Sequence, residues 1–87
     1  MKIYVTYTFI NKEDRDAFYE AIKENHIQEL SLSDEGCLKY SYALLNDTVL
    51  FLKEEWTSQD LQLKHLTKPH MDLLKKLKNQ YSCQTTV

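Results

Sequence analysis

The sequence predicts an α+β fold in which strands and helical regions follow one another in the order β-α-β-β-α-β. Three observations favour this order. Residues 2–9 alternate between apolar and polar side chains, as expected for a strand with one buried face. Residues 37–45 and 48–56 show the same alternation and are close in the chain, which favours an antiparallel hairpin. Apolar side chains recur at helical spacing in residues 14–30 and again after Pro69.

The first helix is predicted to follow Asn11, because an asparagine side chain can accept a hydrogen bond from a free N–H of the first helical turn. Its apolar stripe begins at Ala17 and Phe18 and continues less regularly to Leu30. This pattern predicts one helix over about residues 14–30.

The connections on either side of the second strand are also marked in the sequence. Residues 31–36 are predicted to form a loop that ends at Gly36, the only glycine of the chain. A turn with positive φ is the simplest reason for a glycine there. Asn46-Asp47 is predicted to be the tight turn of the hairpin.

The second helical region is predicted to be interrupted. Ser58 can cap a short helix that runs to about Leu66, and Pro69 suits the first turn of another helix that extends to Tyr81. Residues 82–87 alternate weakly and are expected to form a short last strand. The whole order is that of a ferredoxin-like fold, an antiparallel sheet with helices on one face.

Length and composition limit the classes of protein to consider. A chain of 87 residues is expected to form a single domain, 1–87. The net charge is −2 and no basic run exceeds Lys75-Lys76, which argues against a nucleic-acid partner. No apolar run approaches the ~20 residues that span a membrane, and the N-terminus lacks the pattern of a signal peptide. We therefore expect a cytoplasmic protein in which Cys37 and Cys83 are free thiols.

The two central strands carry large apolar side chains on both faces. Those on one side of the second strand are Leu38, Tyr40, Tyr42 and Leu44. In the third strand, Val49 and Phe51 point to the side opposite Leu50. Because two helices can cover only one face, the open face is expected to pack against a second copy, forming a dimeric α+β barrel. The alternative is a monomer with scattered surface aromatics.

Three segments carry a resemblance to a known family. They are Glu35-Gly36-Cys37-Leu38-Lys39-Tyr40, Phe51-Leu52-Lys53-Glu54-Glu55-Trp56-Thr57-Ser58 and His65-Leu66-Thr67-Lys68-Pro69-His70-Met71. In their order and spacing, the chain resembles the antibiotic biosynthesis monooxygenase family of dimeric α+β barrel proteins. The resemblance implies a homodimer with one pocket per subunit between helices and sheet. It also implies oxygenation of quinol- or anthrone-like aromatics without a metal or an organic cofactor.

Two departures from that family narrow the expected activity. Related oxygenases often carry a substrate-orienting asparagine on the first strand, whereas residues 3–8 contain none. Haem-degrading relatives use a tryptophan near the position where this chain has Lys64-His65. Both departures argue against haem degradation. The segment Glu24-Asn25-His26 is similar to isomerase-like members, so an isomerase of a small polar ketone stays open as an alternative.

A cofactor-free oxygenase needs a base, a dry pocket and a hydrogen-bond donor for developing negative charge. His65 is the first candidate for the base, because the unperturbed pKa of an imidazole suits proton abstraction. Glu54 is the second catalytic candidate, since it shares a strand face with Trp56 and burial would raise the pKa of its carboxyl. The alternative for Glu54 is an ion pair with a lysine at the rim. Trp56 is expected to form core or pocket wall.

Four further residues are candidates for substrate binding, each with a structural alternative. These are His26, His70, Tyr7 and Tyr42. His70 could instead cap a helix, and His26 could complement the dipole at a helix end. No metal site is expected, because His65 and His70 are five residues apart and no carboxylate or cysteine completes a convincing set of metal ligands with them.

The sequence therefore predicts a cofactor-independent monooxygenase that acts on a quinol-like or other small aromatic substrate. This hypothesis requires an apolar pocket holding Trp56 and His65. The isomerase alternative requires a smaller, wetter pocket containing His26. A third alternative is a non-catalytic dimeric protein that binds small molecules, in which side chains fill the cavity and His65 bonds to backbone.

Overall fold

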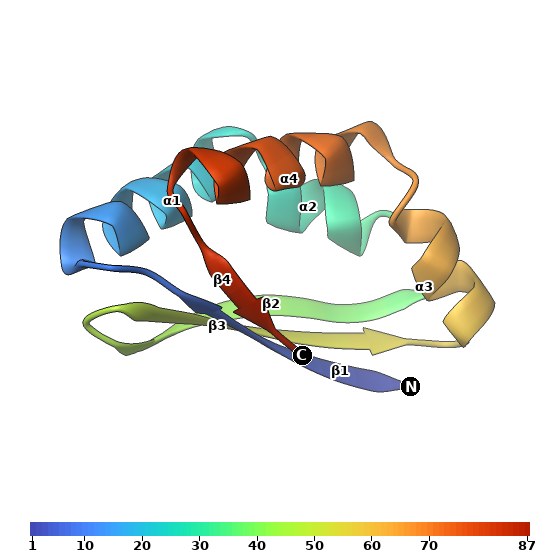
Figure 1. The fold of residues 1–87 in the computed structure, drawn as a ribbon. Helices are drawn as coiled ribbons and strands as arrows, with labels where there is room; N and C mark the ends of the chain where they lie inside the picture. Colours follow the sequence, from blue (N-terminus) through green and yellow to red (C-terminus); the bar gives the residue numbers. More distant parts are fainter.

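The computed structural model describes all residues, 1–87, as one antiparallel sheet covered by helices (Figure 1). The strands are β1 (Lys2–Thr8), β2 (Cys37–Asn46), β3 (Val49–Trp56) and β4 (Gln84–Thr86), and the helices are α1 (Lys12–Glu24), α2 (Ile27–Leu32), α3 (Gln59–His65) and α4 (Pro69–Gln80). The strand order is β2-β3-β1-β4, with every neighbouring pair antiparallel. This arrangement confirms the predicted α+β, ferredoxin-like fold. None of the four helices has the length and apolar character needed to cross a lipid bilayer.

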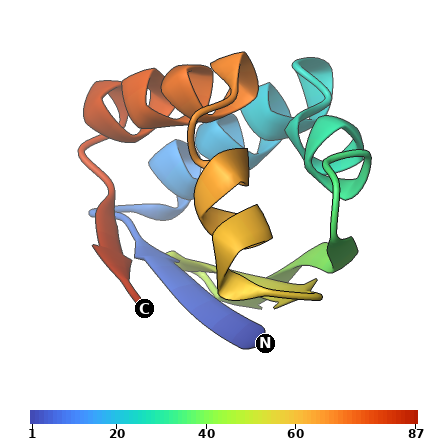
Figure 2. The same cartoon turned by 90° about the vertical axis from the view of Figure 1, so that its right-hand side faces the viewer.

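All helices lie on one side of the sheet (Figure 2). α1, α2 and α4 form a layer above the strands, and α3 stands at one end of the space between this layer and the sheet (Figures 1 and 2). The core fills that space with inward-facing side chains of the central strands and with apolar side chains of α1, α2 and α4. The opposite face of the sheet is left without a covering element, which matches the expectation of one open face.

The prediction of one helix over residues 14–30 is wrong, because the chain turns sharply at His26. α1 ends at Glu24, and His26 adopts a left-handed conformation with φ of 55° before α2 begins. The Asn25 side-chain amide donates to the carbonyl of Ala21 at 2.8 Å, and the backbone N–H of Asn25 donates to the same carbonyl. The turn lets Ile27 enter the core, where a straight helix would have carried it past the sheet.

The predicted alternation of β2 is interrupted by irregularities in its pairing with β3. Leu38 is an extra residue between the pairs that Cys37 and Lys39 make with β3, and it is 60% exposed. A second irregularity before Asn46 leaves Leu45 outside the ladder. The expectation that Leu38 shares a buried side with Tyr40 is therefore wrong, since a bulge shifts the alternation by one residue. The hairpin turn lies at residues 47–48, one residue later than predicted.

Two local features fix the ends of the sheet against the helices. Buried Arg15 of α1 donates to the carbonyl of Asn46, which ties the helix to the turn of the hairpin. At the other end, Gly36 has the expected positive φ of 84°. A Cβ at this glycine would lie 2.5 Å from Leu61 Cδ1 of α3 and 2.8 Å from the Thr57 hydroxyl oxygen. A glycine at this position therefore allows α3 to pack closely against the start of β2.

Candidate active site

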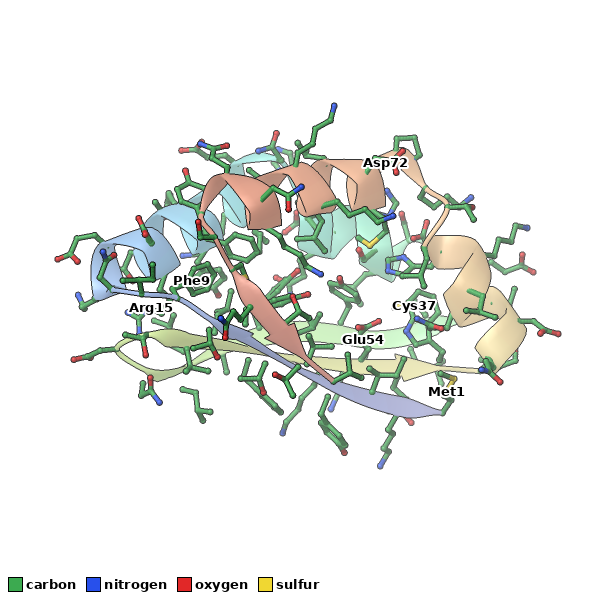
Figure 3. All side chains as sticks on the ribbon, in the orientation of Figure 1. Met1, Phe9, Arg15, Cys37, Glu54 and Asp72 are labelled. Atoms are coloured by element: carbon green, nitrogen blue, oxygen red, sulfur yellow. The ribbon has the colours of Figure 1, made fainter.

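A pocket of about 490 Å³ opens between the sheet and the helices. Its apolar walls come from β1 and α4, including Ile3, Val5, Met71 and Leu74. Its polar side chains include Tyr7, Tyr40, Glu54 and His65. Glu54 rises from the middle of the sheet into the space below the helices (Figure 3). The pocket therefore offers an apolar cavity with a small number of convergent polar groups, which is typical of a small-molecule site.

His65 lies at the end of α3 and is only 1% exposed. Its Nδ1 lies 2.6 Å from Oδ2 of Asp34, and its ring centre is 4.6 Å from that of Trp56. A carboxylate oxygen accepts hydrogen bonds, so the imidazole Nδ1–H donates to Asp34, and Nε2 is the nitrogen that Asp34 does not engage. Since His65 lines the pocket, this arrangement provides a fixed imidazole with one nitrogen available to accept a proton.

Asp34 also binds His70, so one carboxylate oxygen joins both histidines. His70 Nε2 lies 2.8 Å from Oδ2 of Asp34, and the two imidazole ring centres are 5.6 Å apart. The expectation that no carboxylate completes a set with the two histidines is therefore wrong. Asp34 is far from both histidines in the sequence. The only local indication that it could take part in a site was its place in the loop before Gly36.

The three side chains could be considered as metal ligands, because their donor atoms lie within 4.8 Å of one another. Two imidazoles and one carboxylate are a donor set that transition metals accept. However, the same Asp34 oxygen already accepts a hydrogen bond from each imidazole. The two imidazole nitrogens and the carboxylate oxygen that meet here thus satisfy one another, and the geometry fits a hydrogen-bonded relay that orients His65.

Glu54 is the second titratable group of the pocket and is 8% exposed. Its Oε1 accepts a hydrogen bond of 2.9 Å from Nε1 of Trp56. Burial raises the pKa of the Glu54 carboxyl, while the Trp56 hydrogen bond and the charges of His65 and Lys78 oppose that rise. No lysine lies within ion-pair distance of Glu54, so the rim ion pair considered from the sequence is not formed. A neutral carboxyl here could donate a proton into the pocket.

The aromatic candidates fall into two groups. Tyr7 and Tyr40 line the pocket, and burial is the main cause that raises the pKa of each phenol, so both remain neutral hydrogen-bond donors. Tyr42 and Trp56 do not line the pocket. Tyr42 packs edge-on against Tyr40, and its buried hydroxyl has no hydrogen-bond partner. Trp56 is fully buried behind His65 and Glu54. Its ring packs at a tilt against the His65 ring, and its indole N–H donates to Glu54.

His26 is not brought to the pocket. Its side chain is 74% exposed, and Nδ1 lies 3.5 Å from a carboxylate oxygen of Glu29 in the next helix. His70 does not line the pocket either, and it reaches His65 only through Asp34. Of the four predicted substrate-binding candidates other than Trp56, the structure thus places only Tyr7 at the pocket wall.

Two basic residues that the sequence analysis did not single out also line the pocket. Lys75 and Lys78 project from α4 on the side that carries Met71 and Leu74. The spacing of 71, 74, 75 and 78 is that of one helix face, which is the signal that could have identified them. The sequence pattern predicted only the apolar stripe of this helix, because lysines on a helix are usually solvated.

Comparison with known proteins agrees with the fold. Residues 1–76 match the family model described as antibiotic biosynthesis monooxygenase. A conserved protein of unknown function from Bacteroides thetaiotaomicron is 21% identical, with a TM-score of 0.82 over 98% of this chain and 88% of the other. A Deinococcus radiodurans protein assigned to antibiotic biosynthesis monooxygenases is 18% identical, with a TM-score of 0.79 over 99% and 88% of the two chains.

A third solved structure is SnoaB, a cofactor-independent oxygenase from Streptomyces nogalater. It is 9% identical, and the two structures superpose with a TM-score of 0.74 over 98% of this chain and 84% of the other. At such identities these likenesses show a shared fold. No curated protein sequence matches the chain significantly. Because the family match spans residues 1–76 of an 87-residue chain, the protein belongs to the antibiotic biosynthesis monooxygenase family.

Proposed function

We propose that the protein is a cofactor-independent monooxygenase that acts on a quinol-like or other small aromatic substrate. The single observation that carries this proposal is the position of His65. Asp34 holds one nitrogen of its imidazole at 2.6 Å, and the ring lines an apolar pocket of about 490 Å³. A base fixed beside an apolar cavity is what direct reaction of a substrate anion with oxygen requires. Membership of a monooxygenase family supports the same reaction class.

The proposed reaction begins with transfer of a proton from the substrate to Nε2 of His65. The resulting electron-rich anion passes one electron to O₂, and the substrate radical and superoxide combine to form a C–O bond. The proton held by His65 returns to the peroxide oxygen, giving a hydroperoxide at the ring carbon. Loss of water then breaks the O–O bond and the C–H bond of the same carbon and leaves a carbonyl there, with the proton balance of the water supplied by that C–H bond. One oxygen atom enters the product, the other leaves as water, and both electrons come from the substrate.

Other pocket residues have supporting roles in this proposal. The negative charge of Asp34 stabilises the imidazolium that forms when His65 accepts the proton, so Asp34 is a positioning residue. Glu54 in its neutral form can deliver a proton to the departing hydroxide during loss of water. The phenol of Tyr7 remains a neutral donor that can stabilise the substrate anion.

The alternatives left open by the sequence have less support. An isomerase was expected to use His26 in a small, wet pocket, whereas His26 lies outside a cavity with largely apolar walls. A non-catalytic binding protein was expected to have its cavity filled and His65 bonded to backbone. Instead, the pocket is open and His65 is bonded to the Asp34 side chain.

Oxygen consumption over a panel of simple quinols and anthrone tests the proposal. At least one substrate is expected to consume one O₂ per molecule and to give water and a product with one added oxygen atom, anthraquinone from anthrone or a hydroxyquinone from a quinol, at a rate well above uncatalysed autoxidation. The rate should persist after dialysis against a chelator, because no step uses a metal. Autoxidation rates unchanged by the protein across the whole panel would rule the proposal out.

We also infer that the active form is a homodimer joined through the open face of the sheet. Tyr4 and Phe51 stack on that face with ring centres 6.1 Å apart, and Tyr4 is half exposed. Leu45 of β2 is also exposed. An apolar patch of this kind is stabilised when a second copy covers it. Analytical ultracentrifugation should give about twice the chain mass of 10.4 kDa, and a single 10.4 kDa species at micromolar concentration would exclude this interface.

A further inference from the structure

The pocket contains two cations that the proposed oxygenation does not use. Lys75 and Lys78 of α4 both line it. Neither ammonium group forms a salt bridge, whereas Lys12, Lys23 and Lys64 each pair with a carboxylate. The only acidic side chain at the pocket wall is Glu54, and it is engaged by Trp56. Lys75 and Lys78 thus bring two positive charges to a pocket that has a single acidic side chain, Glu54.

The two lysines lie on the same face of α4, Lys75 exposed and Lys78 half-buried. They are three residues apart on α4, which places their side chains side by side on one helix face. Lys78 Nζ lies 5.2 Å from the centre of the Tyr7 ring, inside the layer between helix and sheet. Burial lowers the pKa of Lys78 and the neighbouring charge of Lys75 adds to this effect, whereas Cys83 and Glu54 oppose it. The charges of the two lysines repel each other, and an anion bound between them would relieve this repulsion.

The position of the lysines along α4 sets the size of the ligand. α4 begins beside the Asp34–His65–His70 cluster, because His70 is its second residue. Lys75 and Lys78 follow His70 by five and eight residues, or about 8 and 12 Å along the helix axis at 1.5 Å per residue. The wall between these two ends is formed by Met71 and Leu74, opposite Ile3 and Val5 of β1. This order places an apolar slot between a base and a pair of cations.

We infer that the pocket takes an aromatic substrate bearing a carboxylate, with the carboxylate bound by Lys75 and Lys78 and the rings held between β1 and α4. This inference rests on the pocket being the ligand site of the proposed function, and it adds the class of substrate. A bicyclic aromatic acid spans the slot with its far ring near His65. A carboxylate at the lysine end orients the ring so that the same edge always faces the base.

Calorimetric titration with a pair of redox-inert probes tests the inference. The probes are 2-naphthoate and 2-naphthylmethanol, which share their rings and differ in charge. Wild-type protein is expected to bind the acid about 10-fold more tightly, because hydrogen bonds to charged groups contribute more than neutral ones. Raising NaCl from about 20 to about 300 mM should weaken binding of the acid and leave the alcohol unchanged.

Variants of α4 assign the effect to the two lysines. Lys75→Met and Lys78→Met together are expected to remove the preference for the acid and to leave affinity for the alcohol within about 2-fold. Lys76→Met is the matched control, because Lys76 is exposed, lies on the same helix and does not line the pocket. Thermal melting checks that each variant folds. If the methionine variant does not fold, Lys78→Gln provides a second, polar replacement.

Two results would overturn the inference: equal or absent binding of both probes by the wild type, or an equal loss in Lys76→Met. The oxygen-uptake assay separates this failure from that of the proposed function. Oxidation of neutral quinols without preference for the acid retains the reaction and removes the carboxylate site. Preferential binding of naphthoate with no oxygen uptake retains the carboxylate site and removes the reaction.

Discussion

Replacing His65 with alanine should lower turnover by about 10²–10⁴-fold, the usual contribution of a general base. The substitution removes the only imidazole that lines the pocket. Asp34 keeps one partner in His70, so its buried carboxylate is not left without a hydrogen bond. Steady-state oxygen consumption with the best quinol of the panel provides the measurement. The loss is expected in kcat, because the proton moves only as the transition state forms.

Three comparisons show whether the loss comes from the base itself. His65→Gln can still bond to Asp34 but cannot take a proton, so it should be as inactive as the alanine variant. Added imidazole should restore part of the activity of His65→Ala, since the cavity left behind can hold it. His26→Ala should retain wild-type turnover, because His26 lies at the surface. Wild-type activity in His65→Ala would remove His65 from the mechanism.

Replacing Asp34 with asparagine should lower kcat on the order of 10²-fold while KM changes little. The amide is nearly the same shape as the carboxylate, and its oxygen can still accept from His65 and His70. What the variant loses is the negative charge that stabilises the imidazolium after proton transfer. The effect therefore falls on the step in which His65 becomes charged.

The pH dependence of kcat separates this role from a purely structural one. Without the carboxylate, His65 becomes a weaker base and loses its proton at lower pH. On the acid side of the profile, where activity appears as the pH rises, the midpoint should therefore move to lower pH than in the wild type. A structural role alone would lower the melting temperature and the amount of folded protein, with the pH profile unchanged. An Asp34→Asn protein with wild-type kcat and pH profile would show that the carboxylate has no part in positioning His65.

Much of the fold could be predicted from local sequence patterns. Alternation of period two marked β1 and the β2–β3 hairpin, and the Asn11 and Ser58 caps marked the beginnings of α1 and α3, where each side chain accepts a backbone N–H as expected. Positive φ at Gly36 was also readable, because a single glycine in an 87-residue chain needs a conformational reason. These features depend on residues that are near one another in the chain.

The errors in the fold have one physical cause. The helix of residues 14–30 breaks at His26, and Leu38 leaves the alternation of β2, although neither residue type forbids the predicted element. In both places tertiary packing overrides local preference: Ile27 must reach the core, and the start of β2 must meet the end of β3 beside α3. A pattern of period two or 3.6 contains no information on such contacts.

The sequence by itself determined the order of strands and helices, the open sheet face, and His65 and Glu54 as residues to consider. Only the tertiary structure decided which residues meet at the pocket. Asp34 binds His65 and His70 across 31 and 36 residues of chain, and Lys75 and Lys78 line the pocket because α4 packs over the sheet. The reason is that local spacing sets the conformation of each segment, whereas the partners of a side chain depend on how distant segments pack together.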